Sequence, residues 1–320
     1  MGSSTITPNM AWEICAWVDQ GASGSPPAPW TTVFVPIVAN PNFAVVLQDS
    51  LNPQQYALVI QGTTNAWDAL LDCKINAPVS FSPVAGAYIA QGANQGLNNV
   101  LSLTDNSWKH KFESLHQFLV SIDWNANYLF LAGHSLGGTV ASLMAPWAAV
   151  NLFGQQQPLG SLPAAIQAIT FAPYAGGNQQ FADFLNSQSN YQANFNTNDA
   201  VPHVWAMAGQ YSVPNMYLLF PSPGPSPMPS YLQKLVQDQF NGMYPPDFGY
   251  MQTNGTSFTF PSAQAPLSLS PDKQWEWELS YQHNYAYCMQ FGGSASSCQY
   301  LMPTDDSLTK EHGRTAERVR

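Results

Sequence analysis

The chain has 320 residues, of which 45% are hydrophobic, so it is long enough to bury the core of one large α/β domain or two smaller ones. Its formal charge is −10, with only nine basic residues, and four of these lie in the last eleven positions. So few cations exclude the basic surface that nucleic acids require, and we expect neither a nucleic-acid partner nor electrostatic attraction to anionic lipid.

Strand-like and helical runs alternate along the first two hundred residues. This order predicts an α/β fold, with a mostly parallel sheet and helices on both of its faces. We expect helices over residues 10–20, 107–122, 138–153 and 178–187, and strands over residues 32–38, 43–48, 56–61, 128–132, 168–172 and 193–195.

The pattern weakens after Pro202. Residues 220–230 contain five prolines, which excludes a helix or a central strand there. A short helix over 231–240 and irregular or edge strand structure over 248–271 are expected next. The composition changes abruptly at the end, and residues 309–320 are predicted to form a disordered tail.

Membrane and export signals are weak. Residues 128–150 lack charge, but glycines and a proline interrupt them, so no transmembrane segment is predicted. The first residues show neither the basic segment nor the apolar segment of a signal peptide.

Four cysteines are present, without the spacing of a metal site, so we expect no metal and no other cofactor. Cys288 and Cys298 flank a stretch rich in glycine and serine. A disulfide between them and a set of reduced thiols are both open interpretations. The other two cysteines are Cys15 and Cys73.

The strongest chemical motif is the pentapeptide G-x-S-x-G from Gly133 to Gly137. An apolar strand precedes it and an apolar helix follows it, which is the context of a nucleophile elbow. We therefore predict that Ser135 is a nucleophile at the carboxyl end of a strand.

A serine hydroxyl needs a base, because it is barely acidic at neutral pH. His203 and His283 follow Ser135, and the chain order nucleophile, acid, histidine favours the late His283. His203 is a candidate neighbour of the site, and His134 is predicted to be a packing residue. The remaining histidines are His110, His116 and His312.

Asp199 is the best candidate for the acid. It follows a strand-like segment, in the kind of loop that delivers a carboxylate to an imidazole. An aspartate that only supports its own turn is the alternative interpretation.

Together, the GHSLGG segment, the N-x-x-D-x-V-P-H segment around Asp199 and the late histidine resemble the class 3 lipase family. A further similarity lies at Gln61–Thr64, where the family has an R-G-[ST] turn followed by a lid and an aspartate, here Asp72. Residues 178–184 also resemble a family segment. The resemblance covers roughly residues 56–203 and resumes near His283.

The resemblance implies an α/β-hydrolase fold for residues 1–308 as one domain, with an insertion at about 211–275 before the histidine. Ser135 would be the nucleophile, Asp199 the orienting acid and His283 the base. Thr63 and the backbone N–H of Leu136 would form the oxyanion hole.

The sequence departs from the family pattern in two places. Gln61 stands in place of the family arginine, and 84 residues separate Asp199 from His283. The possible lid, residues 63–72, carries Trp67, Leu70 and Leu71, which could instead pack into the core.

The resemblance also implies the substrate class. It predicts a serine carboxylic-ester hydrolase, foremost a triacylglycerol lipase that acts on lipid esters, including those at a lipid–water interface. A feruloyl-type esterase, a phospholipase A1 and an inactive binding protein of the same fold are the alternatives. The family's secreted enzymes, the possible disulfide and the sequon at Asn254 favour secretion.

Overall fold

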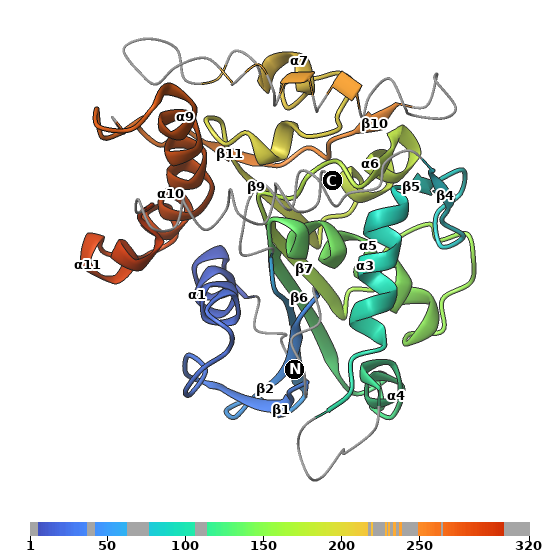
Figure 1. Cartoon of the computed structure of the whole chain (residues 1–320). Helices are drawn as coiled ribbons and strands as arrows, with labels where there is room; N and C mark the ends of the chain where they lie inside the picture. Colours follow the sequence, from blue (N-terminus) through green and yellow to red (C-terminus); the bar gives the residue numbers. More distant parts are fainter. Residues whose placement is uncertain are drawn as a thin grey trace.

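A seven-stranded mixed sheet forms the centre of the protein in the computed structural model (Figure 1). The structure describes residues 6–36, 42–62, 77–105, 114–216, 219, 228, 230, 233–234, 237–238, 249–263 and 265–303. The strands are β1 (Trp30–Phe34), β2 (Ala44–Asp49), β3 (Gln55–Ile60), β6 (Tyr128–His134), β7 (Ile166–Phe171), β9 (Tyr191–Asn196) and β11 (Thr256–Phe258).

The order of the strands is β1-β2-β3-β6-β7-β9-β11. The five strands from β3 to β11 run parallel, whereas β1 and β2 are antiparallel to their neighbours. The carboxyl ends of the parallel strands therefore share one edge, where α/β proteins place their functional loops.

Helices cover both faces of this sheet. On one face lie α1 (Pro8–Asp19) and α10 (Ala286–Gln290), and on the other lie α3 (Gln91–Leu101), α4 (Leu115–Val120), α5 (Leu136–Asn151) and α6 (Gln179–Asn186) (Figure 1). Alternate residues of each central strand enter opposite cores, as their period of two requires. Leu58 and Ile60 pack towards α5, whereas Ala57 and Val59 pack towards α1.

Smaller elements frame the carboxyl edge. Two-residue strands form a second sheet, in the order β10-β8-β5-β4. The C-terminal segment continues as α9, a π-helical turn, α10 and α11. The bounds are β4 Val79–Ser80, β5 Tyr88–Ile89, β8 Gly177–Asn178, α7 Val213–Met216, β10 Tyr250–Met251, α9 Pro271–Ser280 and α11 Ala295–Cys298, with short helical turns at Val201–His203, Tyr281–Tyr285 and Gln299–Leu301.

The predicted α/β fold with a mostly parallel sheet is confirmed, and most expected elements lie within a few residues of their predicted bounds. Two helices differ. The helix expected over 107–122 covers only Leu115–Val120 of the described residues, because the Ser114 hydroxyl caps the Gln117 N–H at 3.2 Å and so fixes its start. Helix α3 was not expected, because its glycines and asparagines favour helices poorly.

Several predictions fall outside the described residues. They concern the possible lid at 63–72, most of the proline-rich segment and the tail at 309–320. Among the described residues, no helix combines the length and the hydrophobicity that a membrane crossing needs.

Candidate active site

Ser135 lies at the sharp turn between β6 and α5, at the carboxyl edge of the sheet. Its φ of 57° and ψ of −129° place a non-glycine residue in a strained backbone conformation, and its N–H donates to the Phe171 carbonyl at 2.9 Å. This is the geometry of a nucleophile elbow, which the motif predicts.

Glycines let the elbow pack against the turn that follows β3. A Cβ on Gly137 would collide with the carbonyl oxygens of Ile60 and Gln61, and a Cβ on Gly62 would lie 2.7 Å from the carbonyl oxygen of His134. The absence of these side chains brings the backbone before Thr63 against the elbow.

Asp199 lies in the turn after β9 and is completely buried. One carboxylate oxygen accepts the N–H of Val201 at 3.0 Å, and the other lies 2.8 Å from Nδ1 of His283. The aspartate therefore supports its own turn and also contacts the imidazole.

His283 lies in the π-helical turn between α9 and α10, a local irregularity that often marks functional sites. Its side chain is 2% exposed. Burial lowers the pKa of His283 below its ordinary value, and the nearby carboxylate of Asp199 opposes this shift without cancelling it. The neutral imidazole, which can accept a proton, is thereby favoured.

His134, the residue before Ser135, packs against His283. The rings of His134 and His283 lie 4.5 Å apart between centroids, and Ser135 is the next residue along the chain. Ser135 Oγ and His283 Nε2 are both buried, and neither has a hydrogen-bond partner among the described residues. Both atoms are therefore free to bond a reactant, as a nucleophile and a base require.

Several contacts around the histidine were not predicted from the sequence. His134, expected only to pack, has Nε2 2.8 Å from the carbonyl oxygen of His283 and Nδ1 3.3 Å from Asp19. The hydroxyl of Tyr287 accepts the N–H of Asn196 at 2.8 Å and bonds to Asp199. Burial raises the pKa of Tyr287 well above its ordinary value, so its proton remains available to Asp199. No short motif signals these contacts.

Other predicted residues are placed as follows. His203 is buried, with Nδ1 3.2 Å from the Ser212 carbonyl oxygen, and burial lowers its pKa. Leu136 is the first residue of α5, so its N–H has no carbonyl partner within the helix. Four predicted site residues lie outside the described residues, namely Thr63, Trp67, Leu70 and Leu71.

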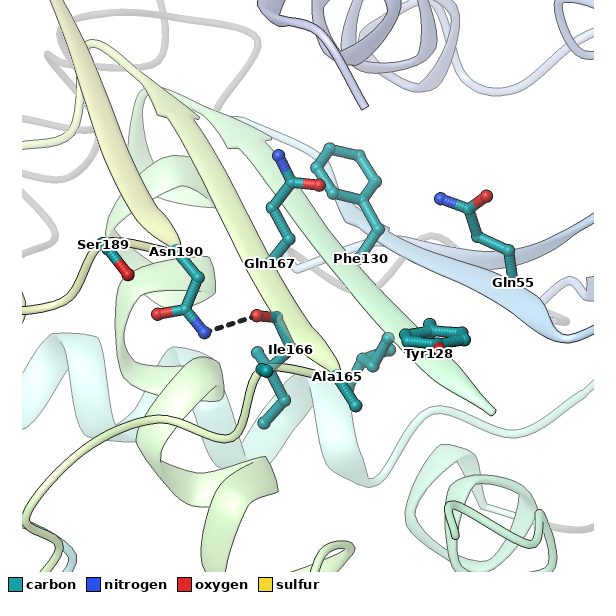
Figure 2. A pocket seen from close by; sticks show the side chains of 10 residues that line it. Gln55, Tyr128, Phe130, Ala165, Ile166, Gln167, Ser189 and Asn190 are labelled. Carbon is teal, nitrogen blue, oxygen red and sulfur yellow. Dashed lines mark hydrogen bonds between the residues drawn. The ribbon is translucent and has the colours of Figure 1, made fainter. Parts of the chain in front are cut away.

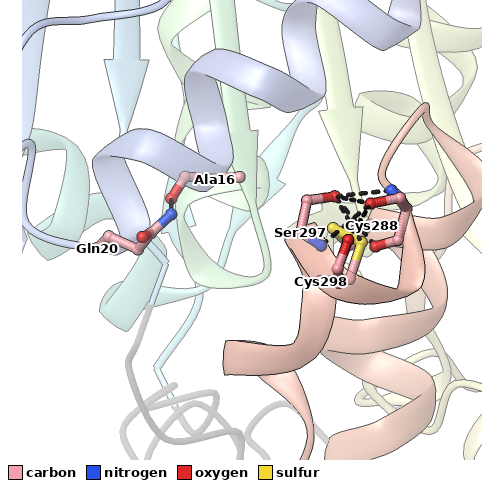
Figure 3. Close-up of a disulfide and its surroundings, with 7 residues drawn as sticks. Ala16, Gln20, Cys288, Ser297 and Cys298 are labelled. Atoms are coloured by element: carbon pink, nitrogen blue, oxygen red, sulfur yellow. Dashed lines mark hydrogen bonds between the residues drawn. A yellow bond between two sulfur atoms is a disulfide. The ribbon is translucent and has the colours of Figure 1, made fainter.

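Two cavities lie away from Ser135. One of about 220 Å³ opens at the opposite edge of the sheet, among the first residues of β6 and β7, where Asn190 donates to the Ile166 carbonyl at 2.7 Å (Figure 2). The other, of about 510 Å³, lies between α1 and the C-terminal segment. A disulfide joins Cys288 to Cys298 beside it (Figure 3).

Known proteins resemble this chain in sequence and in fold. The family model for class 3 lipases matches residues 57–208. No curated protein matches the chain in sequence.

Among solved structures, the crystal structure of M37 lipase matches 89% of this chain and 86% of its own, with 19% identity and a TM-score of 0.69. A triacylglyceride lipase from Rhizomucor miehei shares 19% identity, covers 62% of this chain and 72% of its own, and has a TM-score of 0.44. A triacylglycerol lipase from Penicillium expansum shares 19% identity, covers 61% and 71%, and also has a TM-score of 0.44.

The family match includes the elbow and Asp199, and the similarity in fold to M37 lipase covers 89% of the chain. The predicted resemblance is thus confirmed: residues 57–208 match the family model of the class 3 lipases, and the fold is that of the α/β hydrolases.

Proposed function

We propose that the protein is a serine carboxylic-ester hydrolase, a triacylglycerol lipase, in which Ser135 is the nucleophile, Asp199 the orienting acid and His283 the base. The family match supports hydrolysis of lipid esters. The observation that carries the residue roles is the buried contact of 2.8 Å between His283 and Asp199, together with the strained backbone of Ser135, whose hydroxyl has no hydrogen-bond partner among the described residues.

The chemistry follows from this geometry. His283 Nε2 takes the Ser135 proton as Oγ attacks the ester carbonyl, and Asp199 stabilises the imidazolium that forms. When the tetrahedral intermediate collapses, the imidazolium gives its proton to the leaving alkoxide, and an acyl-serine ester remains. A water, deprotonated by His283, then attacks this ester. The carboxylic acid leaves and Ser135 regains its proton.

The negative charge on the intermediate needs donors held in advance. The N–H of Leu136 is suited to this role, because it is the first of α5 and lies at the positive end of the helix dipole. We assign the second donor to Thr63, which directly follows Gly62 at the turn against the elbow.

Action at a lipid surface is part of the proposal. Ser135 and His283 are 0% and 1% exposed, so an ester reaches them only after the residues that cover them move. A lipid–water interface would favour such an opening, because it offers apolar surroundings to the side chains that are displaced. We also propose that the protein is secreted, since its disulfide suits an oxidising compartment.

Hydrolysis of p-nitrophenyl esters from acetyl to palmitoyl, with and without an emulsion, tests this proposal. We expect the wild type to cleave long chains with a rise in rate at the interface, and Ser135→Ala to lose about 10⁶-fold in kcat. Cleavage restricted to short soluble esters would favour an esterase. Equal inactivity of both proteins, and no labelling of Ser135 by a fluorophosphonate, would indicate a binding protein.

A further inference from the structure

Asp19, the last residue of α1, connects two parts of the site that are far apart in sequence. Its Oδ1 accepts the N–H of Gly62 at 2.9 Å, and its Oδ2 lies 3.3 Å from Nδ1 of His134. The first contact holds the turn before Thr63, and the second holds the residue before Ser135. One carboxylate therefore links the oxyanion turn to the nucleophile elbow.

His134 extends this link to the base. Its Nε2 donates to the carbonyl oxygen of His283 at 2.8 Å, since a carbonyl can only accept. The His134 side chain is 4% exposed, and Trp12 of α1 packs edge-on against its ring with centroids 5.3 Å apart. A buried ring with a polar contact at each nitrogen has little freedom to turn, and its bond to the carbonyl holds the backbone of His283 in place.

Gln61 fastens the same turn to α1 from the other side. Its Nε2 lies 3.1 Å from the Val18 carbonyl oxygen and 3.2 Å from that of Asp19. The last turn of α1 has no basic residue, and the Gln61 amide donates to two of its final carbonyls. The glutamine that stands in place of the family arginine thus has a partner of its own.

We propose that Asp19 and His134 are positioning residues for ester hydrolysis, which hold the oxyanion turn, the elbow and the base to the end of α1 as one unit. The inference rests on the proposed function. Neither side chain takes part in bond making. Each acts on backbone groups whose placement sets the distances between the reacting atoms and the oxyanion donors.

The expected effect is on kcat. A drift of about 1 Å in the oxyanion donors or the base can cost about 100-fold in rate. Asp19→Ala removes both hydrogen bonds, and we expect a fall of about 10- to 100-fold in kcat on p-nitrophenyl butyrate. KM should stay within about twofold, because the interactions lost serve the transition state.

Asp19→Asn provides the conservative rescue. Its carbonyl can still accept the Gly62 N–H, and its amide can donate to His134 Nδ1 in the neutral ring. We expect kcat within about threefold of the wild type. Asp183→Ala is the matched control, because it removes an exposed carboxylate on α6 that bonds only Gln179 among the contacts described. It should behave as the wild type.

Three outcomes would overturn the inference about Asp19. Wild-type kcat in Asp19→Ala overturns the inference, as does an equal loss in Asp19→Asn, which would attribute the effect to charge alone. A loss that matches the unfolded fraction seen by circular dichroism would reduce Asp19 to a purely structural role and overturn it as well. If the wild type itself hydrolyses no ester, the proposed function fails instead, so the two failures are distinguishable.

Discussion

His283 Nδ1 and Asp199 Oδ2 lie 2.8 Å apart, although 84 positions separate the two residues in the chain. The intervening chain leaves the sheet after β9, returns to it as β11 and continues through α9 to the π-helical turn. A long excursion is compatible with a short contact because both ends are fixed on the sheet, and loop length itself costs little free energy.

Asp199→Asn should lower kcat by about 10⁴-fold while leaving the fold intact. The amide can still contact the imidazole, but it no longer stabilises the positive charge or selects the correct ring tautomer. Steady-state kinetics beside the surface control Asp183→Asn measure this effect. Retention of more than about a tenth of wild-type kcat would contradict the assigned role of Asp199.

The acid limb of kcat/KM should have its midpoint below pH 6.5, the ordinary pKa of histidine, because burial lowers the pKa of His283. The neutral ring, and with it activity, then persists into mildly acidic solution. The unfolded chain binds this proton more readily, so the same shift reduces stability as the pH falls from 6.5 through the lower pKa of the folded state. A buffer series on a soluble ester provides the profile, and a midpoint at or above 6.5 would contradict the assignment.

Gly137→Ala should damage both stability and activity. The new Cβ would collide with the backbone oxygens of Ile60 and Gln61, and these atoms cannot turn away as a side chain would. We expect the free energy of unfolding to fall by about 1–3 kcal/mol and kcat by at least about 10-fold. Gly160→Ala is the control, because a Cβ there meets nothing within 4 Å. Equal behaviour of the two variants in denaturant melts and kinetics would refute the packing argument.

Glu278 should make the fold less stable as the pH rises. Burial raises its pKa from 4.5 to about 7, so the folded protein holds this proton more tightly than the unfolded chain. The stabilisation that this protonated carboxyl gives the folded protein is fully present below pH 4.5 and is lost as the pH rises through about 7. Urea midpoints at about pH 5 and pH 8 should therefore differ less in Glu278→Gln than in the wild type. Glu13→Gln, on the exposed side of α1, should retain the wild-type difference.

The motif-based part of the site could be predicted from the sequence. The elbow depends on local glycines, and the chain order after Ser135 leaves Asp199 and His283 as the best candidates. The structure brings these two together, whereas the predicted role of Thr63 stays a prediction because that residue lies outside the described part of the chain.

The supporting contacts could not be predicted in this way. Asp19 meets His134 across 115 positions and Gly62 across 43, and ordinary residue types make both contacts. Helix α3 was missed for a related reason. Its two glycines and three asparagines have low intrinsic helix propensity, and the packing of Ala93, Leu97 and Val100 into the core stabilises the helix instead.

The burial of Ser135 determines what a covalent inhibitor measures. A hydroxyl with no exposed surface cannot meet a reagent by simple collision. An organophosphate must wait for an open conformation, so at high reagent concentration the inactivation rate should reach a ceiling equal to the rate of opening. The kinetics of inhibition would therefore measure the rate at which the site opens. The same rate would limit the turnover of any ester that is cleaved faster than the site opens.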